Sequence, residues 1–439
     1  MVKILSYNIF FKSMLNKPLH KKCNIICDSE NNLEYNSCLK NVSNFIKDNS
    51  DCDFVLLQEA TNWNILQKIT PVLRNMKFVN HKYDLEEIVT FYNSRYKLDK
   101  SYHTIKGYMS DKNRPFLITF FNDNLCIINL HAGHNQDIYR FDEHLIKILE
   151  NNRYKNIFLD KLKTYNIIIA GDFNDNLQDS SFKILVNKYF GIKGGRKLYG
   201  FNKTPSCCNY NLDTIYQNKS YDQILSTLSN VSTQVITNKS ASDHMPIIGF
   251  VNKNIGYDFD GVLHINVSQP DIEGQRHPPN LTGPYEPFKK IIDDIIDYLK
   301  NGDKIFIITA RHNRKQNLKS IIDHLNNTKL SNYLDKITIL FSGGSDKTKL
   351  LRKYKINSFY DDSCLRIKEL YLSQTNGHIP DLTELYLVYP EKNKYVKITE
   401  ENSHHLCMNN QIAGDFKNID WDCIDKCYRM ILSTMNNNL

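Results

Sequence analysis

Polar residues that can bind a metal ion or move a proton follow apolar stretches at several places in the first part of the chain. They are Asn8 in SYNIF, Glu59 in LLQEA, His131 in NLHAGH, Asp172 and Asn174 in AGDFND, and Asp243 and His244 in SDHMP. Amide and carboxylate oxygens such as those of Asn8, Glu59 and Asp243 are the ligands that a hard cation such as Mg²⁺ prefers. A histidine held near a carboxylate can take a proton from water near neutral pH. This first series predicts a metal-assisted hydrolytic site.

A second series of polar residues begins soon after His244. It comprises Asp258 and Asp260 in YDFDGV, Thr309 in IITAR, Lys347 in SDKTK, and Asp361 and Asp362 in FYDDS. At the carboxyl ends of parallel strands these groups would converge in one crevice. One Asp could then attack a phosphoryl group while a second protonates the leaving oxygen, with Thr and Lys neutralising the phosphate oxygens and Mg²⁺ on the remaining acids. The second series predicts phosphoryl transfer to an aspartate.

The elements that must position the first series are strands interrupted by one or two helices. Strands are expected at VKILSYNIF, CDFVLLQEA, IVTFYNSRYKL, PFLITFFND, NLCIINLHAGH, YNIIIAGDFND, SYDQILS and MPIIGFV. Apolar runs separated by polar turns are typical of strands. Helices are expected in YNSCLKNVSNFIKDNS and from about Asp137 to Leu162. We predict a two-sheet α/β sandwich over residues 1–251.

After Val251 the pattern becomes a regular alternation of strand and helix. Strands expected at NIGYDFDGVLHI, DKIFIITA, ITILFSGG and INSFYDD alternate with helices at PFKKIIDDIIDYLKNG, NLKSIIDHLNN and SDKTKLLRKYK. Such alternation implies parallel βαβ units, so residues 255–400 are predicted to form a doubly wound, Rossmann-like parallel sheet. The domain junction is expected at VNKN, and residues 401–439 are expected to be an appended helical tail.

In order and together, the motifs of the first series resemble the endonuclease/exonuclease/phosphatase superfamily over roughly residues 1–251, with GDFN and SDHMP as the most specific parts. The resemblance implies that Asn8, Glu59 and Asp243 belong to the metal site, with Glu59 a direct ligand. It also implies that Asp172 and Asn174 contact the attacking water and the phosphate.

The same resemblance gives roles to two histidines. His244 matches the catalytic histidine, and Asp222 in SYDQILS matches the carboxylate that orients it, as in a hydrolase triad. His131 matches a histidine that binds phosphate or acts as an acid. Because NLHAGH departs from the Pro-Asn motif of abasic-site endonucleases, Asn129 or His134 could share the role of His131 in binding phosphate.

The second series resembles the haloacid dehalogenase-like phosphatases over roughly residues 255–395. The resemblance makes Asp258 the nucleophile and Asp260 the acid/base, with both also counted among the metal ligands. It makes Thr309 the phosphate-binding hydroxyl of the second motif and places Asp361 and Asp362 on the metal side.

The phosphate-binding lysine of that family has two candidates here, Lys347 and Lys349, which lie near the start of the same expected helix, and Lys347 is the better match. Between Asp260 and Thr309 there is room for one Pro-rich loop and one helix but not for a large cap domain. In this family a small or absent cap implies an open site that accepts a macromolecular end. Basic residues expected near its mouth are Arg276, His277, Arg311, His312 and Arg314.

The bulk composition indicates the kind of protein in which these sites work. A chain of 439 residues is longer than one hydrophobic core usually supports, which favours two domains. Its apolar runs are too short to span a membrane, and its N-terminus does not read as a secretion signal. The 11 cysteines lack a framework spacing, which favours reduced thiols and a soluble intracellular protein of cytoplasm or nucleus, in a host cell if the source is viral. A zinc site in the tail, around Cys407, Cys423 and Cys427, is an alternative for some of them.

The net charge of +8 favours an anionic partner such as nucleic acid. Our leading hypothesis is a monomeric, bifunctional enzyme that binds no membrane, with Mg²⁺, or Mn²⁺ in its place, in both domains. The first domain would cleave phosphodiester bonds of DNA or RNA, and the second would remove phosphates from nucleic-acid ends. Two alternatives stay open: cleavage of phosphoinositide or sphingomyelin head groups by the first domain, and a domain that serves only as a binding module.

Overall fold

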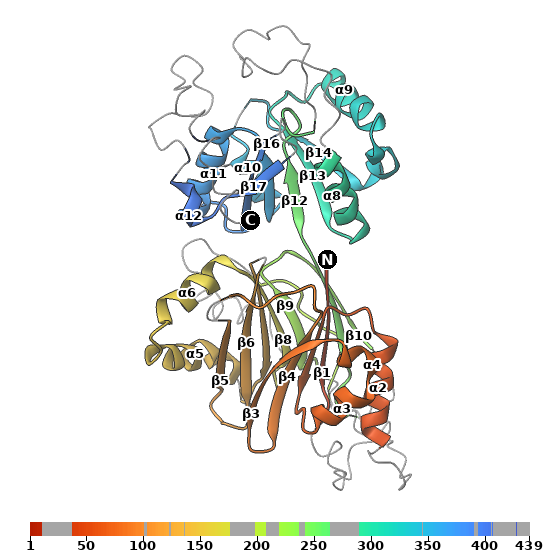
Figure 1. The fold of residues 1–439 in the computed structure, drawn as a ribbon, viewed down its shortest axis with the longest axis vertical. Helices are drawn as coiled ribbons and strands as arrows, with labels where there is room; N and C mark the ends of the chain where they lie inside the picture. The colour runs from red at the N-terminus through yellow and green to blue at the C-terminus, as the bar shows by residue number, and fades with distance from the viewer. Residues whose placement is uncertain are drawn as a thin grey trace. The chain divides into compact units, whose positions relative to one another are not determined.

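The computed structural model describes residues 1–10, 37–100, 103–122, 124–135, 137–175, 198–207, 219–236, 242–263, 289–344, 346–389, 394–404, 406 and 427. The chain divides into two compact units, Val2–Val251 and Asn252–Leu439, with Met1 assigned to the second (Figure 1). The expected Pro-rich loop with Arg276 and His277, the cysteines Cys407 and Cys423, and the helix expected near the end of the tail lie outside the described residues.

The first unit contains two β-sheets. A six-stranded sheet has the order β10-β11-β1-β2-β4-β3, and a five-stranded sheet has the order β5-β6-β7-β8-β9. The strands are β1 (Val2–Asn8), β2 (Phe54–Gln58), β3 (Lys77–Tyr83), β4 (Glu86–Tyr92), β5 (Thr104–Tyr108), β6 (Pro115–Phe121), β7 (Leu125–His131), β8 (Asn166–Asp172), β9 (Asp222–Ser226), β10 (Asn230–Val235) and β11 (Ile247–Asn252). Both sheets are mixed, because β1 runs parallel to β2 and antiparallel to β11, and β7 runs parallel to β8 and antiparallel to β6.

The two sheets pack face to face through one apolar layer. Ile4 and Leu56 of the six-stranded sheet belong to the same buried cluster as Ile127 and Ile168 of the five-stranded sheet. Successive side chains of a strand point to opposite faces, so their neighbours face outward and pack elsewhere. Helices α2 (Ser37–Asp48), α3 (Trp63–Ile69) and α4 (Pro71–Arg74) share a core with the six-stranded sheet, and α5 (Phe141–Glu150) and α6 (Lys155–Thr164) share one with the five-stranded sheet. The first unit is therefore a mixed α/β sandwich.

The single helix expected from about Asp137 to Leu162 is wrong in its continuity. The segment consists of the short 3-10 helix η1 (Asp137–Arg140), α5 and α6. Helix α5 ends at Glu150, and the side chain of Asn152 accepts a hydrogen bond from the backbone N–H of Tyr154 at 2.8 Å. An asparagine that bonds the backbone two residues ahead stabilises a turn in competition with the helix.

The second unit is built on one six-stranded sheet of order β14-β13-β12-β15-β16-β17. The first five strands in that order are parallel to their neighbours, and β17 is antiparallel to β16. The strands are β12 (Asn254–Tyr257), β13 (Lys304–Thr309), β14 (Ile337–Phe341), β15 (Ser358–Asp361), β16 (Glu384–Tyr389) and β17 (Lys394–Lys397). Strand β12 is central and shorter than the sequence suggested, since it ends at Tyr257, directly before Asp258.

Helices cover both faces of this sheet. The elements are α8 (Lys289–Lys300), α9 (Lys315–Asn326), η2 (Lys329–Lys336), α10 (Thr348–Lys353), α11 (Cys364–Thr375) and α12 (Glu400–Ser403). Ile305 and Ile307 of β13 pack in one buried cluster with α8 and α9, whereas Phe306 and Ile308 pack in another with α10 and α11. The α/β class that the sequence predicts is thus observed in both units. Among the described residues, no helix combines the length and apolar character needed to cross a membrane.

The expectation of reduced cysteines is wrong at Cys38, Cys207, Cys364 and Cys427, which are disulfide-bonded. Cys364 and Cys427 form a disulfide, with their Cα atoms 6.8 Å apart. Both cysteines are almost fully buried, and Cys427 of the tail lies against Cys364 in the first turn of α11. This bond also takes Cys427 out of the zinc site considered for the tail. Cys52 and Cys126 are buried and are not in a disulfide.

Candidate active sites

The polar groups of the first series converge at one edge of the sandwich because of strand register. In the five-stranded sheet His131 lies beside Asp172, and Asp172 lies beside Asp222, at the ends of three neighbouring strands. In the other sheet Asn8 is the last residue of β1 and pairs with Gln58, the residue before Glu59. Residues from five separate parts of the chain therefore meet in one buried cluster, which we call the first cluster.

His244 lies between two carboxylates of this cluster. Its Nδ1 lies 2.9 Å from Asp222 Oδ2, and its Nε2 lies 3.4 Å from Asp172 Oδ2. Although burial favours the neutral ring, Asp222 and Asp172 raise the pKa of His244 well above its ordinary range. Burial raises the pKa of Asp222, an effect that contact with His244 opposes. The Sγ of Cys207 also lies 3.5 Å from Nε2.

Asn8 connects two acids of the first cluster. Its Nδ2 donates to Glu59 Oε1 at 3.3 Å and to Asp172 Oδ2 at 3.0 Å, and its backbone carbonyl accepts a 2.6 Å bond from the Ser242 hydroxyl. Ser242 in turn holds the backbone N–H of His244 at 3.1 Å. The SDHMP motif and the end of β1 are thereby fixed to each other.

His131 forms the other side of the first cluster. Its Nε2 lies 3.5 Å from Asp172 Oδ2 and 3.8 Å from Glu59 Oε1. Its Nδ1 lies 3.7 Å from Glu86 Oε2 and 3.3 Å from the Nη1 of Arg114, which itself lies 3.4 Å from Glu86 Oε1. Arg114 and Glu86 are thus part of the site.

Glu86 is a residue that sequence reasoning misses. It is the first residue of β4, its side chain is 10% exposed, and it reaches His131 across from the other sheet. The only sequence signal was a pair of glutamates, Glu86 and Glu87, at the start of an apolar strand. Glu87 faces elsewhere, since it accepts a 2.6 Å bond from Trp63 Nε1.

The remaining predicted residues of the first series lie at different depths. Asn174 is next to Asp172: its N–H donates to Asp172 Oδ1 at 2.8 Å, and its side-chain amide donates to the Ala132 carbonyl. Asp243 is half-buried beside Ser242. Asn129 is fully buried, and its amide is bonded by Gln58 and by the backbone of Val89, which leaves it with protein partners rather than an open face.

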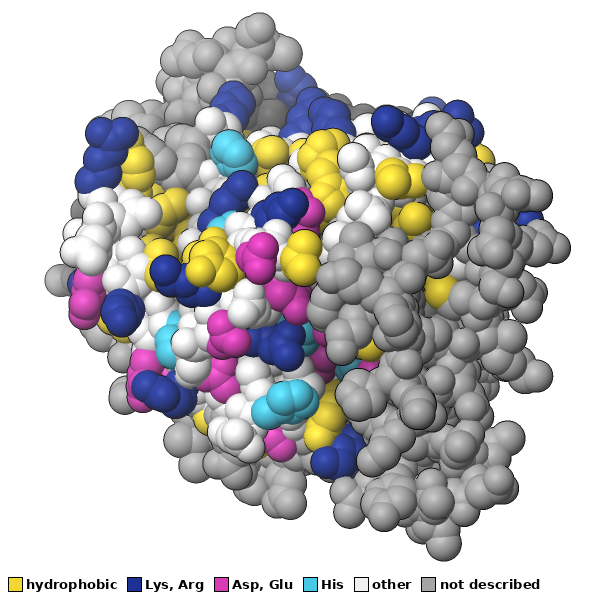
Figure 2. Space-filling model, turned by 90° about the horizontal axis from the view of Figure 1, so that it is seen from below, with side chains coloured by type: hydrophobic (Ala, Val, Ile, Leu, Met, Phe, Trp, Pro, Cys, Tyr) yellow, Lys and Arg dark blue, Asp and Glu magenta, His cyan; other side chains and the backbone are white. Residues whose placement is uncertain are grey.

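The donor set of the first cluster fits a divalent cation. Ligand atoms of Glu59, Glu86 and His131 lie within 4.8 Å of one another, and those of Asp172, Asp222 and His244 form a second such group. Carboxylates and imidazoles bind Mg²⁺, Mn²⁺ or related ions. The histidines lower the pKa of Asp172 although burial opposes this, so that the acid stays ionised as a ligand must. Figure 2 shows a face of the molecule on which histidine, acidic and basic side chains lie next to one another.

The second series forms a separate cluster, the second cluster, around Lys347. Its Nζ lies 2.6 Å from Asp258 Oδ2 and 2.8 Å from Asp361 Oδ2, and the lysine side chain is only 3% exposed. Burial opposes the charge, but the two carboxylates raise the pKa of Lys347. Lys349, the alternative lysine, is exposed. The two acids come from the ends of the parallel neighbours β12 and β15, as the expected crevice requires.

The acids of the second cluster outnumber its buried cation. Ligand atoms of Asp258, Asp361 and Asp362 lie within 4.8 Å of one another. Burial, with the nearby charges of Asp361 and Asp258, raises the pKa of Asp362 well above its ordinary range, and burial raises that of Asp258 to about 7. A divalent cation on these oxygens would relieve the repulsion, so this donor set fits Mg²⁺ or Mn²⁺.

Gly261 allows the two halves of the second cluster to approach. Its φ is +81°, and a Cβ atom there would lie 2.0 Å from Asp362 Oδ2. Only glycine combines that backbone conformation with so close a contact. The glycine of the DFDG motif therefore makes room for an acid that is far away in sequence.

Asp260 is held by a guanidinium. Arg311 donates to its two oxygens at 3.0 Å and 2.6 Å, and the Thr309 hydroxyl lies 3.3 Å from Oδ2. The Arg311 side chain is 22% exposed and that of Asp260 is 41% exposed, so this pair lies nearer the surface than Lys347. Arg311 was expected only as one of several basic residues at the mouth.

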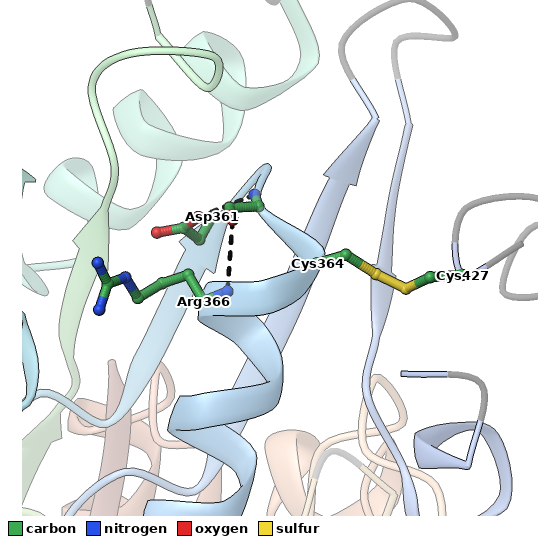
Figure 3. The surroundings of a disulfide bond; sticks show 5 residues. Asp361, Cys364, Arg366 and Cys427 are labelled. Atoms are coloured by element: carbon green, nitrogen blue, oxygen red, sulfur yellow. Dashed lines mark hydrogen bonds between the residues drawn. A yellow bond between two sulfur atoms is a disulfide. The ribbon is translucent and has the colours of Figure 1, made fainter. Parts of the chain in front are cut away.

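The loop after β15 carries the metal-side acids into helix α11. Ser363 donates its N–H to Asp361 Oδ1 at 2.9 Å and accepts from the N–H of Arg366 at 3.3 Å, which caps the helix. Figure 3 shows that Cys364, the first residue of the helix, is joined to Cys427 beside this loop. The disulfide thus links the start of α11, the helix that follows Asp361, to Cys427.

Comparisons with known proteins give one extended match. The chain is 53% identical over 411 residues, which is 93% of its length and 82% of the relative, to the uncharacterized protein L684 of Acanthamoeba polyphaga mimivirus. No protein-family model matches the chain.

Three solved structures illustrate the similarity to part of the chain. Truncated TDP2 of Caenorhabditis elegans matches 56% of this chain and 96% of its own at 15% identity and a TM-score of 0.36. The mannosyl-6-phosphatase Bt3783 of Bacteroides thetaiotaomicron matches 57% and 99% at 15% identity and a TM-score of 0.38. ANGEL2, a 2′,3′-cyclic phosphatase, matches 56% and 94% at 15% identity and a TM-score of 0.39. These TM-scores are too low to assign a shared fold.

Proposed function

Because this chain belongs to the same protein family as the uncharacterized protein L684 of Acanthamoeba polyphaga mimivirus, whose name states no activity, we propose a function from its own two clusters. The first unit is a metal-dependent phosphodiesterase of the endonuclease/exonuclease/phosphatase type that cleaves nucleic acid. The second is a phosphatase of the haloacid dehalogenase type, on a doubly wound sheet, that removes phosphates from nucleic-acid ends. The observation that carries the proposal is His244 placed between Asp222 and Asp172, with Asn8 and Glu59 beside them.

In the first unit His244 is the base in its neutral form, which the positive charge of a bound cation would favour against the pull of Asp222 and Asp172. Asp222 holds its Nδ1, so Nε2 faces the cluster and can take the proton of a water that attacks phosphorus. Asp172, with Asn8 and Asn174 bound to it, orients that water. On the other side His131, held between Glu86 and Arg114, can protonate the leaving oxygen, and Arg114 can neutralise charge on the phosphate.

A cation in the first cluster would be held by Glu59 with Glu86 or Asp243, and when bound it would supply positive charge against the phosphate oxygens. The proposal assigns Mg²⁺ or Mn²⁺ to this position because the available oxygens are hard ligands. Asn129 accepts a hydrogen bond from Gln58, the residue before Glu59, and so helps to position Glu59.

In the second unit Asp258 is the nucleophile. One of its oxygens attacks phosphorus, and the bond from phosphorus to the leaving alcohol oxygen breaks while Asp260 donates a proton to that oxygen. Water then attacks the aspartyl phosphate, Asp260 takes the water proton, and inorganic phosphate leaves with Asp258 restored. Lys347 and Thr309 bind phosphate oxygens, and Arg311 is free to do so when it releases Asp260.

The two activities suit each other chemically, since cleavage of a phosphodiester leaves a phosphorylated end. The formal charge of +8 supports an anionic substrate. Asp361 and Asp362 would hold the cation of the second unit together with Asp258.

A substrate panel tests the proposal. End-labelled single- and double-stranded DNA and RNA are incubated with wild type, His244→Ala and Asp258→Asn, with a soluble inositol phosphate in parallel. We expect His244→Ala to lose strand cleavage only and Asp258→Asn to lose release of end phosphate only. Failure of wild type to act on any oligonucleotide would overturn the proposal. If the inositol phosphate were hydrolysed faster than any oligonucleotide, an inositol phosphate rather than nucleic acid would be the substrate.

A further inference from the structure

A group of rings lies beside the first cluster on strands β3 and β5. Tyr108 packs against His81 with centroids 4.6 Å apart and against Tyr83 at 5.6 Å, and Lys112 Nζ lies 5.5 Å from the centre of the Tyr83 ring. We call these four residues the aromatic ledge. None of them takes part in the proposed chemistry of either unit.

The ledge is exposed at Tyr83 and Lys112, half-buried at His81 and Tyr108, and fixed in position. Tyr83 is 38% exposed, one of few large apolar side chains at that level among the described residues. The Tyr108 hydroxyl donates to the Lys82 carbonyl at 3.4 Å, so hydrogen bonding and ring contacts hold Tyr108 from several sides. Burial, followed by the charge of Lys106, lowers the pKa of His81 to about 4, so its ring is uncharged near neutral pH. A flat surface held in this way loses little entropy when another ring stacks on it.

Strand register places the ledge next to the proposed reaction centre. Tyr83 is the Cα partner of Glu86, whose carboxylate contacts His131. Tyr108 is the Cα partner of Pro115, the residue after Arg114. The ledge therefore lies on strands that neighbour those of Glu86 and Arg114, two groups of the proposed reaction centre.

The charges around the rings indicate the kind of ligand. Lys106 of β5 and Lys112 in the turn that follows are exposed, and the charge of Lys106 acts on His81 while Lys112 lies over Tyr83. Aromatic rings beside lysines bind single-stranded nucleic acid, because unpaired bases stack on the rings while the cations meet the phosphates. In a duplex the base faces are already stacked and unavailable. We propose that the aromatic ledge stacks an unpaired base next to the phosphate that the first unit cleaves, so that its preferred substrate is single-stranded nucleic acid.

This inference rests on the proposed phosphodiesterase, and binding can be measured apart from cleavage. Anisotropy of a short fluorescein-labelled oligonucleotide in EDTA reports binding without turnover. We expect Tyr108→Leu or Tyr83→Leu to weaken single-strand binding by about tenfold, with a much smaller effect on the matching duplex. Tyr108→Phe keeps the ring and should bind like wild type.

Tyr154 provides a matched control. Arg153 lies 4.5 Å over its ring in the connection between α5 and α6, so Tyr154→Leu removes an aromatic ring paired with a cation away from the ledge. This variant should bind the oligonucleotide as wild type does. A thermal melt of each variant separates lost binding from lost folding, and Tyr83→Leu, at the more exposed ring, serves if Tyr108→Leu does not fold.

The outcomes separate the ledge from the proposed function. Unchanged single-strand binding by both leucine variants would overturn the ledge, as would an equal loss for single strand and duplex. If the leucine variants lost binding to anionic vesicles but kept oligonucleotide binding, the ledge would be a lipid-binding surface, and the proposal of base stacking would be overturned. Bis(p-nitrophenyl) phosphate contains no nucleobase to stack on the ledge. Its hydrolysis by wild type therefore tests the phosphodiesterase activity by itself.

Discussion

The Nδ1 atom of His244 lies 2.9 Å from Asp222 Oδ2, and both side chains are almost completely buried. Because Asp222 holds Nδ1, the imidazole has one orientation, and Nε2 is the ring nitrogen that faces the other acids. The contact joins Asp222, the first residue of strand β9, to His244 in the SDHMP motif.

Replacing Asp222 with asparagine should therefore disable the first unit while leaving its fold in place. The amide keeps the size but cannot stabilise a charged imidazole, so we expect phosphodiester hydrolysis to fall by about 10²- to 10⁴-fold. Initial rates on a labelled oligonucleotide check this. Glu143→Gln makes the same change at a side chain that is 60% exposed and should leave the rate unchanged. An Asp222→Asn enzyme with wild-type rates would remove Asp222 from the mechanism.

Asp258 should carry the phosphoryl group in the second unit. Wild type mixed with a phosphorylated oligonucleotide and quenched in acid should retain phosphate on the protein, and Asp258→Asn should retain none. We expect release of end phosphate to fall to background in this variant, because an amide is a poor nucleophile. Strand cleavage by the first unit is the internal control. Protein-bound phosphate in Asp258→Asn would place the nucleophile elsewhere.

Mg²⁺ should change the effect of removing a charge from Asp362. Burial and its neighbouring acids raise the pKa of Asp362, so in EDTA Asp362→Asn relieves repulsion and should melt at or above the wild-type temperature. With Mg²⁺ in excess the wild type should gain about 1–3 kcal/mol, whereas the variant should gain less. Differential scanning calorimetry of the two proteins in both buffers measures the crossover. Equal Mg²⁺ stabilisation of both would contradict a cation at Asp362.

Glu384 should stabilise the second unit in a pH-dependent way. It is 4% exposed and bonded by Lys253 at 2.8 Å, Lys397 at 2.9 Å and Ser358 at 2.6 Å. Although burial opposes ionisation, the two lysines lower the pKa of Glu384 far below its ordinary range. Glu384→Gln should cost about 3 kcal/mol of unfolding free energy near pH 7.

The sign of that effect follows from the depressed pKa. The carboxylate contributes its stability above the pKa of the unfolded chain, about 4.3, and loses it as the pH falls toward the pKa of the folded state. Urea unfolding of wild type and Glu384→Gln should thus show a difference that is constant near neutral pH and shrinks in acid. A difference that grows in acid would contradict the ionised carboxylate. Glu369→Gln, at a side chain that is 26% exposed, is the control.

Much of each cluster is predictable from sequence because its residues follow strands that are recognisable by themselves. Asp172 and Asp258 each come at the end of an apolar run, and a strand end fixes where a side chain must lie along the sheet. The sequence favours Lys347 over Lys349, and in the structure Lys347 contacts the two acids whereas Lys349 is exposed.

Glu86 and Arg311 could not be found in this way. Glu86 reaches His131 from the opposite sheet, and the sequence does not state how two sheets are stacked. Arg311 was one of several basic residues near a loop, and only its two bonds to Asp260 distinguish it from the rest. The break between α5 and α6 was missed for a related reason, because both helices present apolar residues to the same core.

The antiparallel pairing of β1 with β11 has a consequence for how the protein is made. Val2 pairs with Val251, and Ser6 pairs with Ile247, so β1 can pair with β2 early but with β11 only after nearly the whole unit has been synthesised. At ribosomal speed that delay is on the order of tens of seconds. Contacts of such high sequence separation also form slowly. A nascent chain therefore carries Asn8 and Glu59 before His244, which completes their cluster, has been synthesised.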